Sequence, residues 1–137
     1  MLGDKAQWAA SSWFDLEGDG DRDLVSLIKR HKGVTVSRHL YENQTDGGHW
    51  LEVSLVGPRA NLEAIGARVV VTTKFGRQAG WVGQSEGSRH SMGIYDIYFG
   101  LGLPLKAESV KVFWPNGKTS QIKNVAADQR VTITPDD

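Results

Sequence analysis

The sequence predicts an all-β protein, folded as an antiparallel β-sandwich or barrel. Glycine is abundant, and its 16 residues are spread along the chain, which indicates frequent turns. Long stretches with a helical period of 3.6 are scarce, whereas β-branched residues that suit a pleated sheet recur in short runs. Some seven such runs follow residue 48, separated by turn signals, and this spacing is typical of a sandwich or barrel.

A chain breaker, Thr45-Asp46-Gly47-Gly48, divides the sequence into segments 1–44 and 45–137. In the first segment we expect one buried strand and then the two strands of a hairpin. These are residues 24–28, 34–36 and 39–41.

The second segment begins with residues 50–56, which alternate in part and end at Gly57-Pro58. Residues 60–65 are expected to form one helical turn, and Gly100-Leu101-Gly102 to close a strand. Asn116-Gly117 suits a type I′ hairpin turn, in which both central residues need positive φ. The expected strands are 50–56, 68–73, 79–84, 94–99, 110–114, 119–122 and 130–134.

Composition excludes several classes of function. The formal net charge is zero, which argues against a general nucleic-acid partner, because phosphate binding needs an excess of Lys and Arg. Cysteine is absent, so disulfides, thiolate metal sites and cysteine nucleophiles are excluded. No apolar stretch approaches the length of a membrane helix, and Met1–Lys5 shows no signal peptide. We therefore expect no membrane insertion.

An acidic loop is the strongest chemical signal. Carboxylates occupy alternate positions from 15 to 23, and two glycines interrupt them. In an extended strand these side chains would share one face and repel one another. Turning inward on a cation resolves the conflict, and calcium accepts six to eight oxygen ligands in flexible geometry. The predicted calcium site comprises Asp15, Glu17, Asp19, Asp21 and Asp23.

Within that site, side-chain ligation is assigned to four residues, Asp15, Glu17, Asp19 and Asp23. Asp21 is expected to contribute its backbone carbonyl, with its side chain pointing outward. The loop is not an EF-hand, because its twelfth position is Ser26 rather than a bidentate Glu. Magnesium fits less well, since it prefers few protein ligands and retains water. The alternative is a solvated acidic turn without an ion.

Catalytic motifs are weak. Gly83-Gln84-Ser85-Glu86-Gly87 matches a nucleophile elbow, but that elbow needs a following helix and then an acid and a histidine. The only later histidine is His90, and the four histidines have no metal-ligand spacing. We therefore expect a glycine-rich hairpin end here, and a protein that is not an enzyme.

The five tryptophans offer a binding alternative. Trp114 alternates with Val110 and Val112 and is expected in the core, and Trp50 is expected to be buried at the start of a strand. Trp8, Trp13 and Trp81 are freer. Exposed aromatic rings can stack on sugars, so a carbohydrate-binding module is the second hypothesis; packing in the core or at a domain junction is the alternative for each.

Motifs in a fixed order carry a resemblance to known families. The strand, acidic loop, strand and Leu40-Tyr41-Glu42-Asn43 resemble the end of an FG-GAP/VCBS repeat, which is one blade of an integrin-like β-propeller. The remainder resembles the ASPIC/UnbV domain. The motifs that carry this second resemblance are His49-Trp50-Leu51, Asn61 with residues 64–69, residues 99–102, residues 110–117 and residues 124–129.

The resemblance implies a partial propeller blade with a calcium loop in residues 1–44, followed by an ASPIC/UnbV-like β domain in 45–137. It implies an extracellular or cell-envelope, non-catalytic module used in interaction or adhesion, as the C-terminal part of a longer propeller protein. The ligand it implies is an unidentified protein or glycan. One departure stands out, because Ser88-Arg89-His90-Ser91-Met92 replaces the family's Gly-Tyr-x-Ser-Gln pattern. If that segment recognises a ligand, the ligand here differs.

Overall fold

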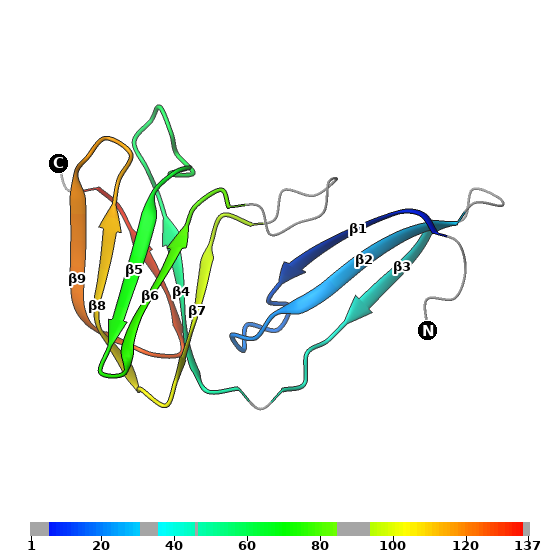
Figure 1. The fold of residues 1–137 in the computed structure, drawn as a ribbon, viewed down its shortest axis with the longest axis horizontal. Helices are drawn as coiled ribbons and strands as arrows, with labels where there is room; N and C mark the ends of the chain where they lie inside the picture. The colour runs from blue at the N-terminus through cyan, green and yellow to red at the C-terminus, as the bar shows by residue number, and fades with distance from the viewer. Residues whose placement is uncertain (1–5, 31–35, 46, 85–93, 136–137) are drawn as a thin grey trace. The chain divides into compact units, whose positions relative to one another are not determined.

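The computed structural model describes residues 6–30, 36–45, 47–84 and 94–135. The chain forms two compact units. One contains the residues up to Thr45, and the other comprises Asp46–Gln84 and Tyr95–Asp137. Every described element is a β-strand, which confirms the predicted all-β class. Figure 1 shows one sheet in the first unit and two sheets in the second.

The first unit is a three-stranded antiparallel sheet with the order β1-β2-β3. Its strands are β1 (Ala6–Phe14), β2 (Asp23–Arg30) and β3 (Val36–Tyr41). The expected hairpin at 34–36 and 39–41 is wrong for the described part, because 36–41 is one continuous strand paired along β2. Residues 34 and 35 lie outside the described residues.

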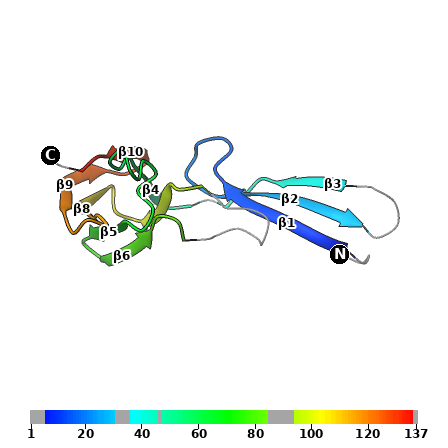
Figure 2. The same cartoon turned by 90° about the horizontal axis from the view of Figure 1, so that it is seen from above.

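The second unit is a sandwich of two sheets, seen edge-on in Figure 2. One sheet has three strands in the order β10-β4-β7, and the other has four in the order β6-β5-β8-β9. The expected seven strands are all present. They are β4 (His49–Leu55), β5 (Arg68–Thr73), β6 (Gly76–Trp81), β7 (Ile97–Gly102), β8 (Lys106–Phe113), β9 (Thr119–Ala126) and β10 (Gln129–Ile133).

The three-stranded sheet is mixed rather than antiparallel, because β10 runs parallel to β4. The connection from β9 to β10 crosses from one sheet to the other. Left-handed backbone at Asn124 (φ 53°) and Asp128 (φ 57°) bends the chain there, and the Asp128 amide donates to the Trp50 carbonyl at 2.7 Å. This crossing delivers β10 to β4 in the parallel direction.

The core lies between the two sheets and follows the alternation of the strands. Leu51 and Val53 of β4 are fully buried, as are Val69 of β5 and Val110 and Val112 of β8. Strand alternation places these side chains on the inner faces. Buried aliphatic surface of this kind stabilises the unit by roughly 25 cal/mol for each Å² removed from water.

Trp114 is buried in this core, as its alternation predicted. Its indole Nε1 donates a hydrogen bond to the Ser120 hydroxyl at 2.9 Å. That hydroxyl in turn donates to the Thr134 carbonyl at 3.3 Å. The polar atom of a large apolar side chain is therefore satisfied inside the sandwich.

The β8–β9 turn differs from the expected type I′ turn. Gly117 has positive φ (85°), but Asn116 does not, and the Gly117 amide donates to the Trp114 carbonyl at 2.9 Å. Pro115 accounts for the difference, because its ring fixes φ near −65° and so favours the first central position of a type I turn.

Three further boundaries differ from expectation. Residues 60–65 form successive turns rather than a helical turn, with Asn61 bonded to both the amide and the carbonyl of Ile65 at 3.0 Å. The β5–β6 turn lies at residues 74–75, so β6 begins at Gly76, three residues before the expected strand 79–84. Gly100 and Gly102 lie inside β7 rather than after it.

A Cβ at Gly48 would lie 2.6 Å from the backbone of Gly102, so the close approach at this end of β7 requires glycine.

Candidate functional site

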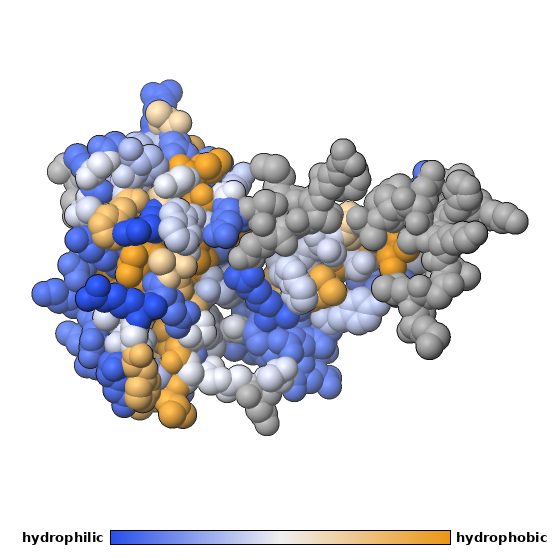
Figure 3. Space-filling model, viewed as in Figure 1, coloured by the Kyte–Doolittle hydropathy of each residue, from blue (hydrophilic) through white to orange (hydrophobic). Residues whose placement is uncertain are grey.

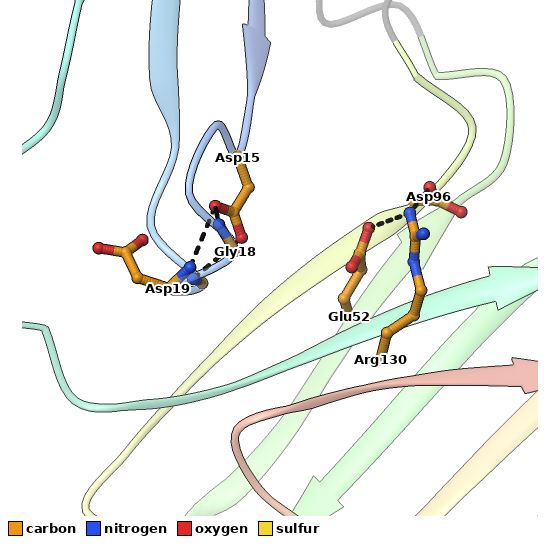
Figure 4. Close-up of polar contacts among 7 residues, drawn as sticks. Asp15, Gly18, Asp19, Glu52, Asp96 and Arg130 are labelled. Carbon is orange, nitrogen blue, oxygen red and sulfur yellow. Dashed lines mark hydrogen bonds and ion pairs between the residues drawn. The ribbon is translucent and has the colours of Figure 1, made fainter.

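The acidic loop connects β1 to β2, and Asp15 organises its first half. Gly18 (φ 79°) and Gly20 (φ 89°) adopt left-handed backbone, which coils the chain back toward Asp15. The Asp15 Oδ1 accepts hydrogen bonds from the amides of Gly18 at 2.7 Å and Asp19 at 3.2 Å (Figure 4). Its Oδ2 accepts from the Gly20 amide at 3.0 Å. One carboxylate thus holds three consecutive donors of the loop.

Asp23 closes the base of the loop. It is the first residue of β2, and its side chain is fully buried. Its Oδ2 accepts from the Leu16 amide at 2.7 Å and its Oδ1 from the Asn43 amide at 2.9 Å. These two hydrogen bonds hold the pKa of Asp23 below its ordinary value, and the bond from the Asn43 amide has the larger effect. Asp23 therefore ties the loop to the chain that leaves β3, a structural role that its place in the acidic pattern did not indicate.

Asp21 departs from expectation. Its side chain was expected to point outward, but Asp21 Oδ1 is buried and has no hydrogen-bond partner among the described residues. The coiling at the two glycines breaks the alternation that would have turned this residue to solvent. Burial, and then repulsion from Asp19 and Asp23, raises the pKa of Asp21. A buried carboxylate oxygen without a partner marks a position where a cation would be stabilised.

Glu17 and Asp19 are exposed. Desolvation and then repulsion from Asp23 and Glu42 raises the pKa of Glu17. Asp19 Oδ1 accepts a hydrogen bond from the Asp21 amide at 3.1 Å. Among the described residues, no three His, Asp or Glu side chains converge as a metal site.

The donor set nevertheless fits calcium. All five predicted side chains offer carboxylate oxygens, which are the hard ligands that calcium prefers. The unpartnered Asp21 oxygen and the raised pKa values of Asp21 and Glu17 point the same way. The structure brings Asp15, Asp19 and Asp21 into one coil of the loop, while Asp23 is engaged by backbone amides at its base.

A second polar cluster lies on the outer side of the three-stranded sheet. Glu52 of β4 is buried although it points away from the core residues that flank it. Arg130 of β10 contacts Glu52 Oε1 at 2.7 Å and Asp96 Oδ2 at 2.5 Å, as Figure 4 shows. The hydrogen bond to Glu52 raises the pKa of Arg130. No local sequence pattern indicates this cluster, because the parallel pairing that sets Arg130 beside Glu52 is a tertiary feature.

A third pair joins the start of β4 to the β9–β10 connection. His49 Nδ1 lies 2.7 Å from Asp128 Oδ2, and the Trp50 amide donates to Asp128 Oδ1 at 3.2 Å. The hydrogen bond with His49 holds the pKa of Asp128 below its ordinary value. Both side chains are partly exposed, and their evident role is to fix the crossing between the sheets.

The remaining candidates from the sequence are the nucleophile-elbow match and the tryptophans. Ser85, Glu86 and His90 of the nucleophile-elbow match lie outside the described residues, as does the segment 88–92. Trp13 and Trp81 are exposed, at 42% and 48%, and Trp50 is half-buried. The Trp8 side chain is outside the described set. In the described ranges, no helix has the length and apolar character needed to cross a membrane.

Comparison with known proteins adds one finding. Residues 57–137, more than half of the chain, match the family model described as ASPIC and UnbV. No curated protein matches the chain. The matched region covers most of the sandwich, from the turns after β4 to the end of β10.

Proposed function

Because the chain belongs to the ASPIC and UnbV family, we propose that it is a non-catalytic, calcium-binding module for interaction or adhesion. Its place of action is outside the cell or in the cell envelope, and its ligand is a protein or a glycan. The sheet β1–β3 with its acidic loop serves as part of an FG-GAP/VCBS-like propeller blade, and propeller repeats of a parent chain are its neighbours.

The observation that carries the calcium proposal is the buried Asp21 Oδ1, which has no hydrogen-bond partner in the part of the chain that the structure describes. Asp15 and Asp23 already direct both of their carboxylate oxygens to backbone amides. Negative charge is therefore concentrated around Asp21, and Asp19 and Glu17 are exposed beside it. A calcium ion would neutralise this charge and bind Asp21 Oδ1 together with carboxylate oxygens of Asp15, Glu17 and Asp19. It would stabilise the loop and take no part in a reaction.

Thermal unfolding with calcium and with a chelator tests this proposal. Because the ion binds only the folded loop, calcium at 100 times its dissociation constant should stabilise the unit by about 2.7 kcal/mol. Trp13, immediately before the loop, offers a fluorescence signal for unfolding of this unit. Asp19→Ala should abolish the gain.

Glu63→Ala is the matched control, because Glu63 is an exposed carboxylate in the turns of the other unit. That variant should retain the full calcium effect. Identical melting curves with calcium and with chelator would refute the calcium site, and equal losses in both variants would refute its place in the loop.

Carbohydrate binding is the second candidate, and exposed Trp81 favours it. Trp81 ends β6 at the surface of the sandwich, where its ring is available to stack on a sugar. A glycan array separates this function from protein-mediated adhesion. Binding to no glycan would remove the second candidate.

A further inference from the structure

The outer side of the four-stranded sheet carries four cations, and no described carboxylate lines the groove on this side. Strand register places the side chains of Arg68 (β5), Arg77 (β6), Lys111 (β8) and Lys123 (β9) on this side, opposite to the buried valines. Phe113 and Trp81 flank Arg68 directly in the register. We call these six residues the basic face. The chain as a whole has zero net charge, so the gathering of these positive side chains on one side of a sheet is a marked segregation of charge.

Within the described part of the chain, Arg68, Arg77, Lys111 and Lys123 form no ion pair. The opposite sheet differs, because Arg130 there is held by Glu52 and Asp96. Like charges on neighbouring strands repel, so four cations that have no ion pair among the described residues are a cost to folding that an anionic ligand would relieve.

Two of these cations are held in place by an aromatic ring. The Arg68 guanidinium lies 4.6 Å from the centroid of Phe113, and the Lys111 ammonium lies 4.9 Å from it. Each contact orders a long side chain while its charged head stays available at the surface. Ordering before binding lowers the entropy cost of capturing a ligand.

The same side is hollowed. A groove of about 360 Å³ is lined by Arg68, Arg77, Lys111 and Phe113, together with Gln121 and Thr72. In Figure 3, hydrophilic residues lie among apolar ones over the side that carries β5 and β6. Four strands at a spacing of about 4.8 Å give a face about 14 Å across, which suits a short segment of an extended polymer.

We propose that the basic face binds an acidic polysaccharide, with its sulfate or carboxylate groups on the four cations. Amide and hydroxyl side chains between the cations match sugar hydroxyls, and exposed Trp81 offers a ring for stacking. A second copy of the chain is disfavoured, because two basic faces would repel. Nucleic acid is disfavoured because four phosphate contacts on a neutral chain give weak, salt-sensitive binding.

This inference rests on the proposed interaction role and is independent of the calcium site. Titration calorimetry of the whole chain with dextran sulfate and with polygalacturonate tests it and distinguishes sulfate from carboxylate. Neutral dextran, polyglutamate and single-stranded DNA are the comparison ligands. We expect binding to at least one acidic polysaccharide, in calcium and in chelator alike, and weaker binding to every comparison ligand.

The double variant Arg68→Gln/Lys111→Gln should weaken polysaccharide binding at least tenfold. It should also lower by about two the number of ion contacts that the salt dependence reports. Arg38→Gln/Arg59→Gln is the matched control, because it removes the same charge at exposed positions outside the four-stranded sheet. Arg77→Gln/Lys123→Gln, which touches neither Phe113 contact, provides a second test if the first variant melts at a lower temperature.

Trp81→Ala should weaken polysaccharide binding and leave polyglutamate binding unchanged. Equal losses in the double variant and its matched control would overturn the proposal, as would tighter binding to polyglutamate or DNA than to both polysaccharides. Absence of binding to either polysaccharide would do the same. Since the calcium effect is read from the melting of the loop unit, either proposal can fail alone.

Discussion

Two groups of carboxylates, one in each unit, satisfy their charge in different ways. In the sandwich, the Arg130 guanidinium bridges Glu52 and Asp96. In the acidic loop, Asp15 and Asp23 accept hydrogen bonds from backbone amides, and one Asp21 oxygen has no partner within the described ranges. The first group is complete without a ligand. The second retains an oxygen without a described partner, so of these two groups it is the one with a physical reason to bind an external cation.

The largest effect is expected from Arg130→Ala, which leaves the buried Glu52 carboxylate beside Asp96 without its cation. Urea unfolding should show a loss of about 2 kcal/mol. The value lies below the ~3–5 kcal/mol typical of a fully buried pair, because Arg130 is 55% exposed and solvent screens the interaction.

Arg68→Ala is the matched control for that measurement, because Arg68 is a strand arginine without an ion pair among the described residues. It should cost about 0.5 kcal/mol through its lost contact with Phe113. Equal losses in the two variants would show that the Arg130 cluster is not a special source of stability.

Neutralising one carboxylate in each group should produce changes of opposite sign. Asp96→Asn should destabilise the sandwich by about 0.5–1 kcal/mol, because it removes an ion pair with a partly exposed arginine. Asp21→Asn should raise the Tm of the loop unit in chelator, because the repulsion that raises the pKa of Asp21 is removed. A lower Tm for Asp21→Asn in chelator would contradict the picture of unbalanced charge in the loop.

The smallest effect is expected at the His49–Asp128 pair, which is partly exposed. The pKa of Asp128 is lowered in the folded protein, so the stabilisation is fully present above the ordinary value of about 3.9. It is lost as the pH falls through the lower, folded-state pKa. Asp128→Asn should therefore lower Tm at about pH 6, and the two curves should draw together as the pH falls below about 3.9. A constant difference across that range would exclude the charged pair as the cause.

Much of the fold could be predicted from the sequence, because core residues alternate with outward-facing residues along each strand. Val110, Val112 and Trp114 alternate with outward residues, and all three are buried. The Asn-Gly pair predicts a type I′ turn at residues 116–117, and this prediction is wrong. The preceding Pro115 occupies the first central position of the turn and favours type I. The parallel pairing of β10 with β4 could not be predicted, since nothing local to either strand encodes its partner.

The candidate sites follow the same division. The acidic loop was visible because its carboxylates are close in sequence, but the separate roles of Asp23 and Asp21 depend on the Asn43 amide and on the coiling at the glycines. Asp96, Glu52 and Arg130 are far apart in sequence, and only the sheet topology brings them together. The basic face likewise emerges from the register of four strands.

The central claim is that the acidic loop binds calcium. A calcium titration monitored by nuclear magnetic resonance tests it most directly. The amides of Gly18 and Gly20 donate hydrogen bonds to Asp15. Their signals should shift as calcium is added and should reach their final positions at one equivalent. The amides of the Glu52–Arg130 cluster should stay in place. Unshifted glycine signals at millimolar calcium, or equal shifts across both units, would contradict the account.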